Sequence, residues 1–201
     1  YVDPKNENKV WVMGTPLSVS IDGGRTFETE WTAQGIHPDH HALWINPNNT
    51  DHMLLGNDGG FHVTYDGART WRFLNNLPIA QYYVIGIDDR DPYHVYGGLQ
   101  DNGTWSIPSR TFSSVGILNE DAVKVGGGDG FAPVIDPRDF TTVYAESQFG
   151  NLERVDLTTG EAKEIRPAAE DSSEAYRFNW SSPLLISPHD PDVIYFGGNR
   201  L

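Results

Sequence analysis

Carboxylate, amide and imidazole side chains recur beside glycine in this 201-residue chain, each time just after a short apolar run. The first such set comprises Asn57–Gly60, Gln100–Gly103, Ser147–Gly150 and Gly198–Arg200. When the segments are aligned on glycine, Asp58 matches Asp101 and then Gln148. Glycine lets a backbone approach a ligand closely, and paired carboxyl groups can act as acid and base on a polar substrate.

A second set of segments precedes the next apolar run in each case: His37–His41, Ala80–Tyr82, Gly126–Gly130 and Arg177–Trp180. The two sets together give three candidate catalytic acids, Asp58, Asp101 and Asp129. The candidate ligand-binding residues are His40, His41, Asn57, Gln81, Tyr82, Gln100, Asn102, Gln148, Asn179, Trp180, Asn199 and Arg200. Convergence of such groups on one concave rim is typical of a polar-ligand site.

Each candidate also has a purely structural interpretation. Asp58 and Asp101 stand in Asp-Gly and Asp-Asn-Gly turns, where an aspartate commonly caps backbone N–H groups. The histidines are compatible with a solvated loop, and Trp180 and Tyr82 with either a core or a sugar-stacking surface. The glycines of Gly126–Gly130 form no phosphate loop, because no lysine and no helix follow them.

Composition narrows the function classes. The chain has 28 acidic and 14 basic residues, a net charge of −14, and no cysteine. Binding of nucleic acid through a basic face is excluded, and anionic membrane surfaces are disfavoured. No apolar run approaches the ~18 residues that a membrane span requires. Disulfides and thiolate metal sites are absent. An acidic, aromatic-rich chain of this kind favours a secreted or periplasmic location.

Internal repetition is the strongest organisational signal, with a proline-containing turn roughly every 40–50 residues. These turns are Asp3-Pro4, Asn46-Pro47, Asp91-Pro92, Asp136-Pro137 and Ser187-Pro188. A short apolar run follows each turn, and another precedes most of them. Four strands in each repeat of this length predict the blades of a β-propeller.

A second motif occurs in two repeats. Ser20–Phe27 and Thr64–Trp71 fit the pattern Ser/Thr-x-Asp-x-Gly-x-Thr-aromatic, although Ala68 replaces the usual glycine. The pattern predicts a hairpin turn in which Asp bonds backbone N–H groups, glycine takes a positive φ, and the aromatic anchors the next strand in the core.

These motifs resemble those of the Asp-box (BNR) β-propellers, a superfamily that includes sialidases, xyloglucanase-type glycoside hydrolases and sortilin-type receptors. The run Leu55–Phe61 is similar to the xyloglucanase segment in which a catalytic Asp precedes Gly-Gly, which implies an acid at Asp58. Together with His37–Leu43 and Gly98–Gly103, the whole chain resembles bacterial sortilin-like propeller proteins described as glycosyl hydrolases. The resemblance implies the fold more specifically than the activity.

The expected fold is therefore all-β, a β-propeller segment of four-stranded antiparallel blades that spans residues 1–201. The blades are predicted at 1–30 (partial), 40–75, 82–126, 130–166 and 178–201 (partial). Because both ends fall inside blades, the segment leaves open edges. We expect the remaining blades of a longer chain, or a partner chain, to cover them.

Four functions remain open from sequence. The first is a sortilin-like module that binds a glycan or peptide at the channel mouth. The second is a glycoside hydrolase that pairs Asp58 with Asp101 or Asp129; a sialidase would require more arginines. The third is a site for a divalent metal ion, formed by His37, His40 or His41 with one of these aspartates. Carboxylate and amide oxygens alone would suit Ca²⁺, whereas histidine would favour a transition metal. The fourth is a structural role in a larger complex. The sequence requires no cofactor.

Overall fold

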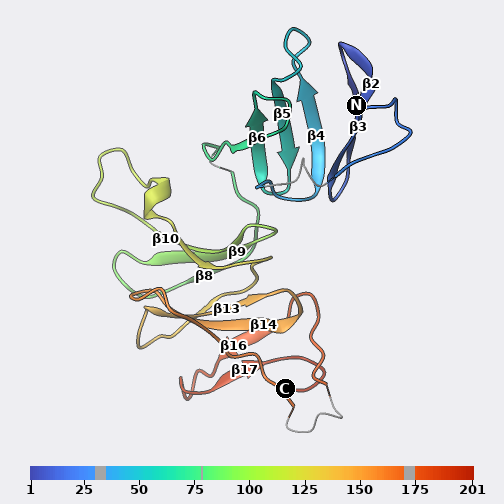
Figure 1. Cartoon of the computed structure of the whole chain (residues 1–201). Helices are drawn as coiled ribbons and strands as arrows, with labels where there is room; N and C mark the ends of the chain where they lie inside the picture. The colour runs from blue at the N-terminus through green and yellow to red at the C-terminus, as the bar shows by residue number, and fades with distance from the viewer. Residues whose placement is uncertain (30–34, 78, 170–174) are drawn as a thin grey trace. The chain divides into compact units, whose positions relative to one another are not determined.

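The computed structural model describes residues 1–29, 35–77, 79–169 and 175–201, and these residues contain no α-helix (Figure 1). The chain divides into two compact units, Tyr1–Ile79 and Ala80–Leu201, which are described separately below. Each unit consists of antiparallel sheets that follow one another along the chain. The predicted class, an all-β propeller segment of four-stranded blades, is confirmed. The assignment of residues 1–201 to one domain with the stated blade boundaries stays a prediction.

The first unit contains two sheets, each ordered as the chain runs. The first sheet comprises β1 (Val2–Asp3), β2 (Asn6–Met13) and β3 (Leu17–Ser20). A bridge between Val19 and Glu28 adds the start of a fourth strand; Glu30, where the first predicted blade ends, lies outside the described residues. The second sheet comprises β4 (His40–Ile45), β5 (Met53–Asn57), β6 (Gly60–Thr64) and β7 (Arg72–Phe73).

The second unit contains three sheets. The first comprises β8 (Tyr82–Ile87), β9 (His94–Leu99), β10 (Gly103–Pro108) and β11 (Val123–Gly126). The next comprises β12 (Val134–Ile135), β13 (Thr142–Ser147), β14 (Asn151–Asp156) and β15 (Ala162–Glu164). The last comprises β16 (Leu184–Ile186) and β17 (Ile194–Phe196). Two single-turn 3₁₀ helices, η1 (Asn119–Asp121) and η2 (Gln148–Gly150), lie in the connections.

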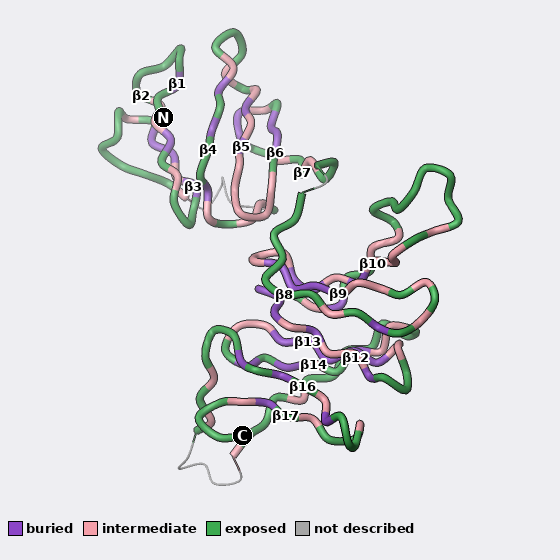
Figure 2. Tube along the Cα trace, turned by 180° about the vertical axis from the view of Figure 1, so that it is seen from behind, coloured by how far each residue is buried: buried purple, intermediate pink, exposed green. Residues whose placement is uncertain are grey.

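Strand β13 in the middle sheet of the second unit is buried on both faces (Figure 2). Val143 and Ala145 of β13 pack with Tyr96 of the preceding sheet. On the opposite face, Tyr144 packs with Leu184 and Phe196 of the following sheet. Successive side chains of a strand point to opposite faces, so one strand contributes to both cores.

The repeated turn has the same backbone hydrogen bond in four of the sheets. The N–H groups of Asn46, Asp88, Asp136 and Ser187 donate to the carbonyls of His52, His94, Thr142 and Val193. In the third repeat, therefore, Asp88 and not the proline-linked Asp91 occupies the turn-initiating position. Alignment on proline missed this register because proline sets φ but takes no part in the hydrogen bond.

The two Ser/Thr-x-Asp turns form as the motif predicts in their polar contacts. The Asp22 carboxylate accepts hydrogen bonds from the backbone and hydroxyl of Thr26, which lower its pKa to about 2. Asp66 accepts the equivalent bonds from Thr70. Ala68 takes a φ of 76°, the conformation expected of glycine. The expected aromatic anchor is wrong for Phe27, which is 44% exposed, whereas Trp71 packs against the core.

Close contact between neighbouring sheets predicts that Gly98→Ala destabilises the protein. A Cβ at Gly98 would lie 2.2 Å from backbone atoms of Gly130 and Phe131. Because backbone has no alternative rotamer, we expect a loss of about 1–3 kcal/mol in the free energy of unfolding. Gly127→Ala is the matched control, since nothing lies within 4 Å of its Cβ position. Urea denaturation of both variants tests this, and equal midpoints would contradict the packing argument.

Candidate functional site

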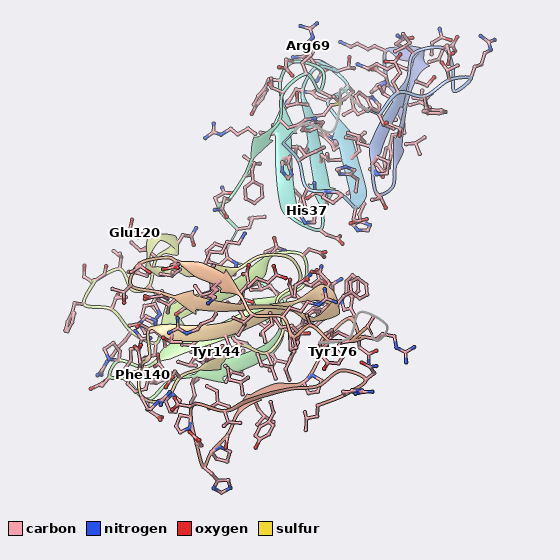
Figure 3. The ribbon with its side chains drawn as sticks, turned by 60° about the horizontal axis from the view of Figure 1, so that its bottom comes forward. His37, Arg69, Glu120, Phe140, Tyr144 and Tyr176 are labelled. Carbon is pink, nitrogen blue, oxygen red and sulfur yellow. The ribbon has the colours of Figure 1, made fainter. Side chains whose placement is uncertain are left out.

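Within each unit, the predicted polar segments lie at the end of the sheets opposite the proline-containing turns (Figure 3). In the first unit, His37 and Arg69 mark opposite ends of the β4–β7 sheet (Figure 3). In the second unit, Phe140 lies in a proline-containing turn and Tyr176 directly precedes the Arg177–Trp180 segment, and the two residues are likewise at opposite ends. The prediction that the polar ends of both units converge at one channel mouth stays a prediction.

Asp129 is the centre of the polar cluster in the second unit. Its side chain comes from the β11–β12 connection and is only 2% exposed. Oδ1 accepts a hydrogen bond from the backbone N–H of Asp101 (2.9 Å), and Oδ2 accepts one from Trp180 Nε1 (3.1 Å). One buried carboxylate thus connects three predicted segments that lie far apart in sequence.

Backbone contacts bring the Asp101 and Asp129 segments together. The N–H of Gly103 donates to the Gly128 carbonyl, and the N–H of Gly130 donates to the Leu99 carbonyl. A Cβ at Gly130 would lie 2.4 Å from the Gly103 carbonyl oxygen. The glycines therefore allow two chain segments, rather than a ligand, to approach each other. Asp101 itself takes a φ of 63°, in the left-handed region.

Three partly exposed aromatic rings surround this cluster. Tyr83 is 43% exposed, Trp180 48% and Phe149 54%. The Phe149 and Trp180 rings meet edge to face with centroids 5.1 Å apart, and Tyr83 stacks on Phe131. Burial, followed by the negative charges of Asp129 and Asp101, raises the pKa of Tyr83.

The other candidates of the second unit lie around this cluster. Gln148 packs against Gly128, and the Asn199 side chain accepts a hydrogen bond from the Arg177 N–H (2.8 Å). Asn102 donates to the Gln100 carbonyl (3.0 Å). The Tyr82 ring covers Gly97 on the neighbouring strand. The remaining candidates, Gln81, Asn179 and Arg200, are exposed.

The first unit holds a separate cluster of histidines. His41 Nε2 lies 2.6 Å from Asp58 Oδ1, with the imidazole largely exposed. Asn57 Nδ2 donates to the His37 carbonyl (2.8 Å) and lies 3.4 Å from His62 Nδ1. His40 and His62 are buried, and the Nδ1 atom of His40 has no hydrogen-bond partner. Burial lowers the pKa of both His40 and His62.

This geometry bears on the open alternatives. Asp129 is buried with both oxygens hydrogen-bonded, so it is poorly placed to protonate a substrate oxygen. Asp58 Oδ1 is paired with His41 Nε2. In the described ranges, no group of three or more His, Asp or Glu side chains is arranged to hold a metal ion.

Sequence analysis missed three residues at these sites: His62, Phe149 and Glu146. His62 stands at a strand position that carries no recognisable motif, whereas Phe149 lies within the predicted Ser147–Gly150 segment but is not itself a polar residue. Glu146, 2% exposed, follows Tyr144 on the same face of β13. An acidic residue in a strand with apolar residues on both faces was the available signal for it.

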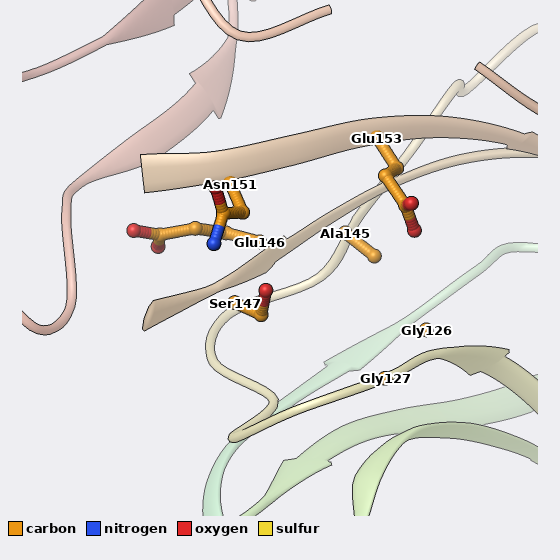
Figure 4. A pocket seen from close by; sticks show the side chains of 7 residues that line it. All are labelled: Gly126, Gly127, Ala145, Glu146, Ser147, Asn151 and Glu153. Atoms are coloured by element: carbon orange, nitrogen blue, oxygen red, sulfur yellow. The ribbon is translucent and has the colours of Figure 1, made fainter. Parts of the chain in front are cut away.

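A small pocket opens on the other face of the same strand. It is lined by Gly126, Gly127, Ala145, Glu146, Ser147, Asn151 and Glu153 (Figure 4). The Glu146 side chain points away from that of Ala145. Ser147, Asn151 and Glu153 therefore supply the polar side chains of this pocket.

No protein-family model and no curated protein matches the chain. Among solved structures it is similar to an ancestral GH74 enzyme, with 13% identity over 99% of this chain and 31% of that chain and a TM-score of 0.35. It is also similar to YCF48 from Cyanidioschyzon merolae, with 13% identity, coverage of 95% and 63%, and a TM-score of 0.40. It is similar as well to an auxiliary nutrient binding protein from Bacteroides thetaiotaomicron. The identity is 13% over 98% of this chain and 51% of that chain, and the TM-score is 0.31.

The chain spans less than two thirds of the length of each of these proteins. At this level of identity the likeness concerns the fold alone. No helix in the described part of the chain has the length and apolar character required to cross a membrane.

Replacement of Asp129 by Asn should destabilise the second unit. One amide group offers a single acceptor oxygen, so either the Asp101 N–H or the Trp180 Nε1–H loses its partner. An unsatisfied buried donor costs about 1–3 kcal/mol, which chemical denaturation measures. In Asp156→Asn, the control, the donors Thr158 and Thr159 are exposed and can turn to water. If Asp129→Asn matched this control, the bridging role would be wrong.

The buried histidines predict acid sensitivity. Because the folded-state pKa values of His40 and His62 lie below the ordinary 6.5, the unfolded chain binds more protons, and stability falls as pH decreases through 6.5. We expect the urea midpoint to fall between about pH 7.5 and 5.5 and His40→Leu to reduce that slope. His189→Leu, at an exposed position, should retain the slope; a wild-type slope in His40→Leu would contradict the assignment.

Proposed function

We propose that this protein is an extracytoplasmic glycan-binding module, with its site at the end of the second unit formed by Asp101, Asp129, Tyr83, Phe149 and Trp180. The observation that carries the proposal is the set of partly exposed aromatic rings around a buried, hydrogen-bonded carboxylate. Sugar rings stack their C–H faces on aromatic side chains, and their hydroxyl groups bond with carboxylates and amides. Gln100, Asn102 and Gln148 supply amides nearby.

Electrostatics favour a neutral glycan over an acidic one. The charges that act on the Tyr83 hydroxyl are those of Asp129 and Asp101, and both are negative. The chain as a whole carries a net charge of −14. Sialosides and polyuronates would therefore meet repulsion on approach and at the rings. A neutral β-glucan or xyloglucan oligosaccharide would not.

Hydrolysis is the weaker alternative. A glycoside hydrolase requires two carboxyl groups on either side of the scissile bond, one of which donates a proton to the leaving oxygen. Asp129 is used in holding Asp101 and Trp180 in place. Binding by a rigid, aromatic rim requires no such proton transfer.

Calorimetric titration with neutral oligosaccharides, sialosides and peptides tests the proposal. We expect binding of a neutral oligosaccharide and a loss of about tenfold in affinity for Trp180→Ala, since one stacked ring contributes about 0.5–1.5 kcal/mol beyond its buried area. Trp44→Ala is the matched control, because Trp44 is 47% exposed and Trp180 48%, but Trp44 lies on β4 of the other unit.

Three outcomes would contradict this function. The first is binding of peptides but of no glycan. The second is equal loss of affinity in Trp44→Ala and Trp180→Ala. The third is release of reducing ends from an oligosaccharide that Asp58→Asn or Asp101→Asn abolishes, which would make the protein a hydrolase.

A further inference from the structure

Glu146 occupies an apolar position between two sheets. It lies opposite Leu152 in the β13–β14 register, on the face where Tyr144 and Leu152 pack with Leu184 and Phe196 of the following sheet. The residue is 2% exposed. A carboxyl group in such surroundings is retained only when its neighbours compensate for lost hydration.

That compensation is incomplete. Glu146 Oε1 accepts a hydrogen bond from the backbone N–H of Ser182 (2.8 Å). Among the residues that the structure describes, the other oxygen, Oε2, is buried without a hydrogen-bond partner, and so is the Ser182 hydroxyl. Glu146 forms no ion pair with any residue that the structure describes.

The segment that Glu146 holds carries the proposed stacking residue. Ser182 follows Trp180 by two residues, and the Trp180 carbonyl accepts a hydrogen bond from Phe149 N–H (3.3 Å). Trp180 Nε1 also donates to Asp129. The Ser182 hydrogen bond therefore fixes one end of the short stretch that places Trp180 beside Phe149 and Asp129.

The elements packed against Glu146 bring no compensating cation to it. The titratable and charged groups on these elements include Tyr144, Arg154, Asp156, Arg166, Tyr176, Arg177, Tyr195 and Asp129, and Glu153 lies on the other face of β14. Arg154 donates to the Thr142 hydroxyl, and Arg166 stacks on Phe178. Burial raises the pKa of Glu146 to about 7, opposed by the hydrogen bond from the Ser182 N–H.

We propose that Glu146 is a proton-dependent positioning residue, which holds the Trp180–Ser182 segment in its binding arrangement while protonated and releases it on ionisation. A carboxylate buried with one donor and no cation is costly, and it gains hydration when the neighbouring segment moves. The 178–183 segment is the part that yields, because β13 is held by β12 and β14. The consequence for ligand binding rests on the proposed glycan site.

The raised pKa of Glu146 determines whether the closed arrangement is favoured at low or at high pH. The protonated carboxyl is favoured in the closed arrangement, so closure is complete below the pKa and is lost as pH rises through it. At pH 8.5, with a pKa of about 7, only about 3% of the carboxyl groups remain protonated. If only that form binds, the apparent affinity falls about 30-fold between pH 5.5 and pH 8.5.

The first experiment follows hydrogen exchange of the Ser182 amide in the wild-type protein, corrected for the intrinsic effect of pH, and requires neither ligand nor variant. We expect Ser182 to lose protection as pH rises through 7. The Ser187 amide, bonded to the Val193 carbonyl in the turn between β16 and β17, should keep its protection. Constant protection of Ser182 from pH 5.5 to 8.5 would overturn the proposal, whatever the ligand.

The second experiment measures oligosaccharide affinity against pH for wild type, Glu146→Gln and the control Glu153→Gln on β14. Gln resembles the protonated carboxyl, so Glu146→Gln should bind with little pH dependence, while Glu153→Gln should follow the wild type. Identical pH profiles for wild type and Glu146→Gln would refute the coupling to binding. Absence of glycan binding at every pH would refute the proposed function. Hydrogen exchange of the Ser182 amide would still show whether Glu146 holds the Trp180–Ser182 segment.

Discussion

The packing of one sheet against the next, with both faces of β13 buried, is the constraint on which the second unit depends. Alternate residues of β13 enter two different cores, Val143 and Ala145 on one side and Tyr144 on the other. Sheets this close bring their connecting segments into backbone contact at one end. Gly98 and Gly130 permit that contact because no Cβ fits between the segments. The proposed binding surface is thus a consequence of how the sheets pack.

Two buried carboxyl groups in this unit have different roles because they have different numbers of donors. Asp129 accepts hydrogen bonds from both Asp101 and Trp180, and each oxygen has a partner. Glu146 has one donor and one unpartnered oxygen. Hydrogen bonds compensate for the lost hydration of the first group more fully than for that of the second. In the proposed site, Asp129 therefore holds its neighbours through hydrogen bonds to both oxygens, whereas the hold of Glu146 depends on its protonation.

The histidine cluster of the first unit follows a related principle. Neutral imidazole tolerates burial, and burial lowers the pKa of His40 and His62. Acidification would therefore destabilise the first unit, and alkalinisation would release the segment that Glu146 holds in the second unit. The interval in which both clusters keep their favoured protonation states lies around neutral pH, between the titration of these histidines and that of Glu146.

The sequence by itself determined the strands, the turns and the set of segments at the polar end. A strand is indicated by the alternation of residue types along a few positions, and a turn by the types of a few neighbouring residues. Both are local properties, so the sequence alone can indicate them. The tertiary structure alone decided that Asp88 rather than Asp91 begins the third turn, that Phe27 remains exposed, and that Asp129 bridges two segments. It also placed Glu146 between sheets. These outcomes depend on which distant residue comes to lie opposite each group, and no spacing along the chain encodes that partner.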